Sequence, residues 1–308
     1  MTQKLIRIDS LANDIDLEPT FLTLGSFDGV HRGHQTVLGE MIEAAHKAGV
    51  RSAVLTFFPH PKRVLQGLRD RYYINTLEDR ETLLAGLGVD LVITHPFNED
   101  IRKIRAADFI NQLRETFDMR QIWGGNFALG YKREGDISFL RRLGSENGFS
   151  VHIVESMVQW NERLVSSSRV RNSLSEGNIS DVNGCLGRPY SLSGTVVRGD
   201  QRGRTISFPT ANLAVWEELI LPANGVYATY AWIGNQRFLA ATNVGVRPTI
   251  NGGDRVVEAH LLDFNGDIYG QTVRLEFSRY LRPEKKFSGL EALKEQIRTD
   301  VVEVRRQL

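Results

Sequence analysis

The fold is decided by residues 22–34, which read LTLGSFDGVHRGH. The apolar run Phe21–Leu24 is typical of a buried strand. Gly25 and Gly29 then predict a tight turn, and the amphipathic stretch Gln35–Ala48 predicts a helix that begins at the second histidine. The stretch therefore predicts a strand, a glycine turn and a helix, in that order.

Two histidines end this stretch. His31 and His34 would lie at the N–H-rich start of the helix, next to glycines that let an anion approach the backbone. A helical His-x-x-His pair is also a metal-binding pattern, but no third ligand stands out and the glutamate of His-Glu-x-x-His is missing. As core histidines the two would need a polar partner, and glycine flanks argue against tight burial. Phosphate binding explains the strand, the glycines and both imidazoles together, so we expect a phosphate site.

Composition bounds the class of protein. The 308 residues are enough for two domains, and 41% hydrophobic and 24% charged residues are typical of a soluble globular protein. A net charge of +1 gives no sign of non-specific nucleic-acid binding. The single cysteine, Cys185, excludes an internal disulfide and fits a reducing compartment. With no apolar run near ~20 residues and no signal-peptide pattern, we expect a cytoplasmic protein without a membrane partner.

Strands and helices alternate up to about residue 186. Thr76 and Asp79 have the spacing of a helix-capping pair, and Gly88 would stop that helix. This alternation predicts βαβ units and hence an α/β domain, residues 1–186, with a mainly parallel sheet covered on both faces. Further strands are expected at Ser52–Phe58, Val89–Thr94, Gln121–Trp123 and Phe149–Val154.

The pattern changes after residue 189. Residues 187–308 contain β-rich segments that no helix interrupts, which predicts an antiparallel barrel. Ser288 and Glu291 have capping-box spacing and predict a terminal helix. The expected strands are Leu192–Val197, Val226–Ile233, Phe238–Asn243, Val256–Phe264 and Thr272–Phe277.

A second polar stretch, VSSSRVR at residues 165–171, precedes a helix. Serine hydroxyls cap helices or donate to phosphate, and arginine offers a fixed fork to phosphate oxygens. Alone, the stretch is typical of an ordinary helix start with solvated arginines. Together with residues 25–34, the glycine-histidine loop, it predicts the second half of a triphosphate site.

These two stretches resemble the motifs of the HIGH-type nucleotidyltransferases. That superfamily transfers a nucleoside monophosphate from a triphosphate to a phosphate acceptor and releases pyrophosphate. The resemblance implies a Rossmann-like domain in which His31, His34 and Arg171 are catalytic. It implies an ATP site formed by Gly25, Phe27, His31, Gly33, His34, Ser167, Ser168 and Arg171, to which the loop at residues 123–130, described next, adds Asn126.

Two more loops follow expected strands, TFFPHP at residues 56–61 and WGGNFALG at residues 123–130. Open α/β sheets bind ligands at such strand ends, although any single aromatic residue here also suits a core. As motifs, the loops resemble the adenylyltransferase half of the prokaryotic bifunctional riboflavin kinase/FMN adenylyltransferases. The resemblance implies an FMN site at Phe57, Phe58, Pro59, His60 and Pro61.

The C-terminal half carries GDQRGRTISFPTAN at residues 199–212. Alone, this reads as a polar hairpin loop, but Pro-Thr-Ala-Asn resembles the signature of riboflavin kinases. The resemblance implies that Glu258 is the catalytic base, that Thr210 and Asn212 bind Mg²⁺, and that Ser207 stands where the family usually has glycine. It implies an ATP site at Gly203, Arg204, Ser207, Thr210 and Asn212.

The sequence thus predicts an enzyme that phosphorylates riboflavin to FMN and adenylylates FMN to FAD, with ATP as co-substrate. One alternative is an FMN adenylyltransferase whose kinase activity is weak or absent because of Ser207. Another is a non-catalytic protein that senses flavin or nucleotide. A nucleic-acid-binding module is not expected, because the chain lacks a basic stripe.

Overall fold

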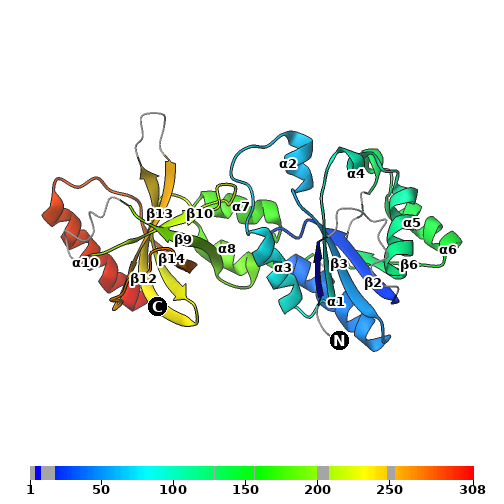
Figure 1. Ribbon diagram of the computed structural model, residues 1–308, viewed down its shortest axis with the longest axis horizontal. Coiled ribbons are helices and arrows are strands. Elements are labelled where there is room, and N and C mark those ends of the chain that lie inside the picture. Colours follow the sequence, from blue (N-terminus) through cyan, green and yellow to red (C-terminus); the bar gives the residue numbers. More distant parts are fainter. Residues whose placement is uncertain are drawn as a thin grey trace. The chain divides into compact units, whose positions relative to one another are not determined.

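The computed structural model describes residues 4–7, 18–125, 127, 129–155, 157–199, 208–247 and 254–308 (Figure 1). The chain forms two compact units. The first contains Met1–Asp70 and Thr76–Val165, and the second contains Arg71–Asn75 and Ser166–Leu308. The short segment Arg71–Asn75 thus packs with the second unit, although its neighbours on both sides in the sequence belong to the first.

The first unit is built on a six-stranded sheet in the order β1-β4-β3-β2-β5-β6. All its neighbouring strands are parallel, as expected. The expected strands are confirmed with ends shifted by a few residues, and β1 is an addition that the sequence did not predict. The strands are β1 (Lys4–Arg7), β2 (Thr20–Gly25), β3 (Arg51–Phe57), β4 (Leu91–His95), β5 (Met119–Gly124) and β6 (Ser150–Ile153).

Helices cover both faces of this sheet. One core contains Leu38 of α1 and Leu84 of α3, and the other contains Phe109 of α5 and Leu140 of α6. Thr76 caps α3, as predicted, by accepting a hydrogen bond from the Asp79 N–H at 3.1 Å. The helices are α1 (Arg32–Lys47), α2 (Pro61–Gln66), α3 (Leu77–Gly86), α4 (Glu99–Lys103), α5 (Ala106–Phe117) and α6 (Ile137–Asn147), with a 3₁₀ turn η1 (Tyr131–Arg133) and a hairpin of β7 (Gln159–Trp160) and β8 (Arg163–Leu164).

Helix α1 begins earlier than the sequence predicted. Its first residue is Arg32, and His31 rather than a residue near His34 is the N-cap. The reason is the imidazole itself, since His31 Nδ1 accepts a hydrogen bond from the His34 N–H at 3.3 Å. It replaces the serine, threonine or aspartate oxygen that usually satisfies such a donor.

The order of the strands reverses next to β2. From β2 the chain proceeds through β3 to β4 on one side, and then returns to place β5 on the other side of β2. The connections that follow β2 and β5 therefore leave the sheet in opposite directions. Open α/β sheets bind ligands in the crevice at the carboxyl ends of such strands.

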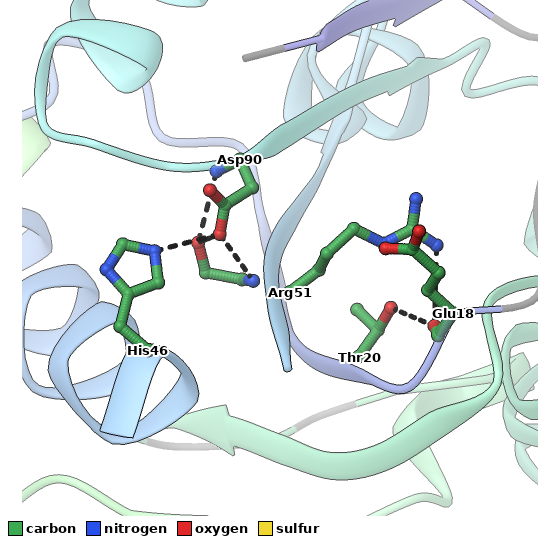
Figure 2. Close-up of polar contacts among 6 residues, drawn as sticks. Glu18, Thr20, His46, Arg51 and Asp90 are labelled. Atoms are coloured by element: carbon green, nitrogen blue, oxygen red, sulfur yellow. Dashed lines mark hydrogen bonds and ion pairs between the residues drawn. The ribbon is translucent and has the colours of Figure 1, made fainter. Parts of the chain in front are cut away.

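At the amino ends of β3 and β4, three elements meet around the carboxylate of Asp90 (Figure 2). Asp90, just before β4, accepts hydrogen bonds from the backbone N–H and the hydroxyl of Ser52, at 2.9 and 2.7 Å. His46, in the last turn of α1, lies 2.9 Å from the same oxygen. Burial raises the pKa of Asp90, but the hydrogen bonds from Ser52 and the contact with His46 outweigh this effect and lower it overall.

The second unit is a closed antiparallel barrel in the strand order β10-β13-β12-β11-β14-β9, with a terminal helix α10 (Figure 1). This confirms the predicted architecture. Two helices, α7 (Ser167–Ser175) and α8 (Ile179–Leu186), precede it. The remaining elements are β9 (Tyr190–Val197), β10 (Ala211–Val215), β11 (Gly225–Ile233), β12 (Gln236–Arg247), β13 (Asp254–Leu261), β14 (Thr272–Arg282) and α10 (Leu290–Gln307).

The predicted capping box of α10 is wrong. The helix begins at Leu290, so that Gly289 is the N-cap, and no side chain caps it. A serine caps a helix only from the N-cap position, because only there does its oxygen reach the N–H groups of the first turn. Ser288 lies one residue too early.

Candidate active sites

The glycine-histidine loop follows β2 and has a strained backbone. Phe27 and Val30 have φ values of +44° and +40°. This region is unfavourable for any side chain and most unfavourable for β-branched valine. The Val30 N–H donates to the Phe27 carbonyl at 3.0 Å, which closes the turn. Such strain persists where the surroundings fix the backbone and is frequent in ligand-binding loops.

The two histidines lie against each other at the start of α1. Their rings stack with centroids 3.7 Å apart and planes 15° apart. Because Nδ1 of His31 accepts the His34 N–H, a neutral His31 carries its proton on Nε2, which is then a donor. A Cβ on Gly33 would lie 3.2 Å from the His31 ring, so glycine gives this ring its space.

The serine-arginine stretch starts α7 in the second unit. Ser166 is the N-cap and accepts the Arg169 N–H at 3.2 Å, so that Ser167 and Ser168 occupy the first turn. Buried Arg169 donates from Nε to Asp181 of α8 at 3.0 Å. This ion pair fixes α7 on α8.

Arg171 is oriented by a residue that the sequence did not single out. Its Nε donates to the Tyr72 carbonyl at 2.8 Å, and its guanidinium lies 3.9 Å from the centre of the Tyr72 ring. Tyr72 belongs to the segment Arg71–Asn75 of the second unit. The distance of 99 positions along the chain explains why no local pattern indicated this contact.

A cavity of about 650 Å³ opens in the first unit next to the glycine-histidine loop. It is bordered by three residues of the predicted FMN site, Phe57, His60 and Pro61, but not by Phe58 or Pro59. His60 also caps α2, accepting the Lys62 N–H at 3.0 Å. The apolar part of the lining, largely missed from the sequence, is Leu24, Leu65, Phe97, Ile101, Ile104, Phe109 and Leu129.

The charged part of this lining is entirely basic. Lys62, Arg102, Lys132 and Arg133 border the cavity, and no carboxylate of the described residues does. Arg102 contacts Glu99 at 2.8 Å, whereas the side chains of Lys62 and Arg133 form no ion pair within the described part of the chain. An apolar cavity with a basic lining suits a flat apolar ligand that carries a negative charge.

The turn that presents Lys132 and Arg133 is held on α5. The Glu134 carboxylate accepts hydrogen bonds from Arg105 Nε and from the Ala106 N–H, at 2.7 and 2.8 Å. A Cβ on Gly130 would lie 2.4 Å from the Ala106 nitrogen, so that only glycine lets the turn approach this closely. The two bases are thus attached to a fixed backbone.

In the barrel, Asn212 and Glu258 lie directly opposite each other on β10 and β13. Asn243 of β12 lies opposite Glu258 on its other side. Directly opposite residues share a face of the sheet, so these three side chains form one row across three strands. A Cβ on Gly199 would lie 2.5 Å from the Asn212 side chain, which shows how closely the end of β9 approaches this row.

Thr210 borders a separate cavity of about 320 Å³, together with residues 264–269, and neither Asn212 nor Glu258 borders it. The chain before Thr210 is fixed to β13, because His260 Nδ1 lies 2.8 Å from the Pro209 carbonyl. The Phe208 and His260 rings add an edge-to-face contact. Four predicted site residues, Asn126, Gly203, Arg204 and Ser207, lie outside the described residues.

Two classes of feature are absent from the described residues. None of their helices is both long and apolar enough to cross a membrane. No group of three or more histidine, cysteine, aspartate or glutamate side chains among them could hold a metal ion.

Sequence comparison matches each half of the chain to a family. Residues 14–169 match FAD synthetase, and residues 186–308 match riboflavin kinase. A crystal structure described as a macrolide-efflux protein from Streptococcus pneumoniae superimposes with a TM-score of 0.91 at 29% identity and covers 98% of both chains. The two chains share one fold.

Relatives that cover both halves carry one common description, bifunctional riboflavin kinase/FMN adenylyltransferase. The Listeria monocytogenes protein is 34% identical over 92% of this chain and 91% of its own length. The Haemophilus influenzae protein is 36% identical over 97% of both chains, and the Escherichia coli protein is 33% identical over 98% of this chain and 97% of its own length. The chain therefore belongs to the bifunctional riboflavin kinase/FMN adenylyltransferase family.

Proposed function

We propose that this chain makes FAD from riboflavin in two ATP-dependent steps. Residues 187–308 phosphorylate riboflavin to FMN, and residues 1–186 transfer AMP from ATP to FMN and release pyrophosphate. The observation that carries the second step is that Ser26 belongs to the glycine-histidine loop and also borders the large cavity. A flavin in that cavity would extend its phosphate toward ATP held by the loop.

In the adenylyl transfer, an oxygen of the FMN phosphate attacks the α-phosphorus of ATP. The bond from the α-phosphorus to the bridging oxygen breaks, and its electron pair leaves with pyrophosphate. An ionised phosphate needs no general base, so the protein acts by alignment and by stabilising negative charge. His31, His34, the start of α1, Ser167, Ser168 and Arg171 supply the donors for this task.

The large cavity holds the flavin ring against Phe57, Phe97 and Leu129. Its bases favour a flavin that carries a phosphate over riboflavin, because charge-assisted hydrogen bonds to phosphate are strong. This preference would make the order of the two steps unambiguous, with phosphorylation first.

In the kinase step, the terminal ribityl hydroxyl attacks the γ-phosphorus of ATP and ADP leaves. A hydroxyl is a weak nucleophile, so Glu258 accepts its proton as the new P–O bond forms. The row of Asn212, Glu258 and Asn243 supports this role, since it places amide groups next to the carboxylate.

The donor set in the barrel fits Mg²⁺. Thr210 and Asn212 offer neutral oxygens, and Mg²⁺ is typically bound by one or two protein groups together with substrate phosphates. When bound with ATP, the ion neutralises phosphate charge. We further propose that the enzyme works in the cytoplasm on small-molecule substrates alone, in keeping with its single, buried cysteine, Cys185.

The test measures FMN and FAD by chromatography after incubation with riboflavin, ATP and Mg²⁺, and separately with FMN, ATP and Mg²⁺. Wild-type protein should make both products. The His31→Ala variant should still make FMN but lose at least 10²-fold in FAD formation, because it lacks a donor at the developing charge. The Glu258→Ala variant should lose FMN formation and still convert supplied FMN to FAD.

Each variant is the control for the other. If one substitution silences both steps in folded protein, the assignment of two separate sites is wrong. FAD formation from FMN without FMN formation from riboflavin would establish the alternative that Ser207 favours, an adenylyltransferase with a weak kinase. Binding of flavin and ATP without either product would identify a sensor.

A further inference from the structure

Arg80 is the largest fully buried side chain among the described residues, with 0% of its surface exposed. It lies on α3, outside the glycine-histidine loop, the stretch at residues 56–61 and the serine-arginine stretch, and it has no role in the proposed chemistry. Burying a guanidinium is unfavourable unless hydrogen bonds compensate for its lost hydration. Its contacts therefore indicate what the residue is for.

The guanidinium contacts the two loops of the adenylyl-transfer site. Its Nη1 donates to the Ser26 carbonyl at 2.8 Å and to the Phe57 carbonyl at 3.1 Å. The Thr56 hydroxyl lies 3.2 Å from the same nitrogen and donates to the Ser26 carbonyl at 3.2 Å. One side chain thus links the end of β2 to the end of β3.

This link stands where the sheet no longer holds the two strands together. The ladder between β2 and β3 ends with the pair Gly25 and Thr56. Ser26 follows Gly25 and Phe57 follows Thr56, and the carbonyls of these two residues are the ones that Arg80 binds. Beyond them the chains separate, one toward His31 and the other toward His60.

We propose that Arg80 is a positioning residue for adenylyl transfer, which sets the separation between the glycine-histidine loop and the loop at residues 56–61, the flavin loop. This inference rests on the proposed function. Ser26 and Phe57 both border the large cavity, so a change in their separation would shift FMN relative to ATP. In-line transfer is sensitive to such shifts, since a displacement of about 1 Å lowers a rate by roughly 10²-fold.

The experiment compares Arg80→Met, Arg80→Lys and Thr56→Val with wild-type protein. For Arg80→Met we expect the kcat of FAD formation to fall about 10²-fold and the KM values for ATP and FMN both to rise. Arg80→Lys should recover part of this loss, because an ammonium can donate to the same oxygens that Nη1 contacts but lies on a shorter side chain. Thr56→Val should lower the rate only several-fold, and it provides a readout if Arg80→Met does not fold.

The matched control is Glu81→Met, on the same helix. Glu81 is also buried but accepts a hydrogen bond from Thr94 of β4, at 2.7 Å, and touches neither loop through that bond. The Glu81→Met substitution should lower the melting temperature and leave the KM values for ATP and FMN unchanged at 25 °C. Circular dichroism of each variant reports whether the first unit is folded, and the riboflavin kinase rate, measured on the same samples, reports the amount of active second unit.

Two results would overturn the role of Arg80. The first is that folded Arg80→Met and Arg80→Lys keep the wild-type kcat and KM values for FAD formation. The second is that Glu81→Met changes kcat and KM as much as Arg80→Met does. A wild-type protein that makes no FAD from FMN and ATP would instead refute the proposed function, before any variant is compared.

Discussion

At the scale of single residues, the basic lining of the large cavity predicts how the enzyme selects its flavin. Lys62 and Arg133 border the cavity and form no ion pair among the described residues. Replacing both by alanine should raise the KM for FMN roughly 10-fold or more, since each charge-assisted hydrogen bond contributes about 1.5–3 kcal/mol. Steady-state kinetics of FAD formation, with FMN varied at saturating ATP, measures this change.

Riboflavin provides the internal comparison, because it has the same ring without the phosphate. Its inhibition constant against FMN should change less than twofold in the double variant. Lys103→Ala, a substitution of an exposed base next to Arg102 that does not border the cavity, is the control for general charge. Equal losses for FMN and riboflavin would show that the substitutions damage the ring site rather than phosphate recognition.

At the scale of elements, Asp90 connects α1, β3 and β4, and its lowered pKa makes this connection depend on pH. Because folding lowers the pKa of Asp90, its carboxylate stabilises the folded state fully at pH values above the ordinary pKa of 3.8. This stabilisation disappears as the pH falls through the lower pKa of the folded state. Asp90→Asn should therefore lower the free energy of unfolding by about 1–3 kcal/mol at pH 7. Urea unfolding followed by circular dichroism from pH 7 to pH 2.5 checks this.

The difference between wild-type protein and Asp90→Asn should stay constant from pH 7 to about 5 and shrink below the ordinary aspartate pKa. A difference that is as large at pH 2.5 as at pH 7 would contradict the proposed origin in the carboxylate charge. Thr20→Ala, which removes a hydroxyl contact at 2.8 Å to the Glu18 carbonyl near the same edge, should show no such pH dependence (Figure 2).

Sequence patterns predicted those elements whose signals are local. Thr76 and Asp79 form the expected cap, and Gly49, with φ of +69°, ends α1 next to the predicted strand β3. The patterns failed where the decisive partner is distant. An arginine within a helix, such as Arg80, ordinarily faces solvent, and only the strand ends brought to it by the fold explain its burial. The contact of Tyr72 with Arg171 is of the same kind.

At the scale of the whole molecule, α8 behaves as part of the barrel unit. It buries Ile179, Val182 and Leu186, and Asn183 accepts the Tyr190 N–H and donates to the Phe277 carbonyl, at 2.8 and 2.9 Å. A fragment of residues 187–308 should therefore be less stable than one of residues 166–308, by roughly 5 kcal/mol from the three apolar side chains. Thermal unfolding by circular dichroism compares the two, and equal melting temperatures would contradict the assignment of α8 to this unit.

The second unit is discontinuous along the chain, and this has a consequence during synthesis. Tyr72 and Tyr73 donate their N–H groups to the Glu218 carbonyl, and Arg71 binds the carbonyl of Leu219, 148 residues later. On the ribosome, the segment Arg71–Asn75 emerges long before these partners exist. The strands of the six-stranded sheet end at Ile153 and are available earlier, whereas the segment Arg71–Asn75 can bind its partners only after residue 220 has left the exit tunnel. Five residues of the first half therefore reach their folded environment only after part of the second half has been made.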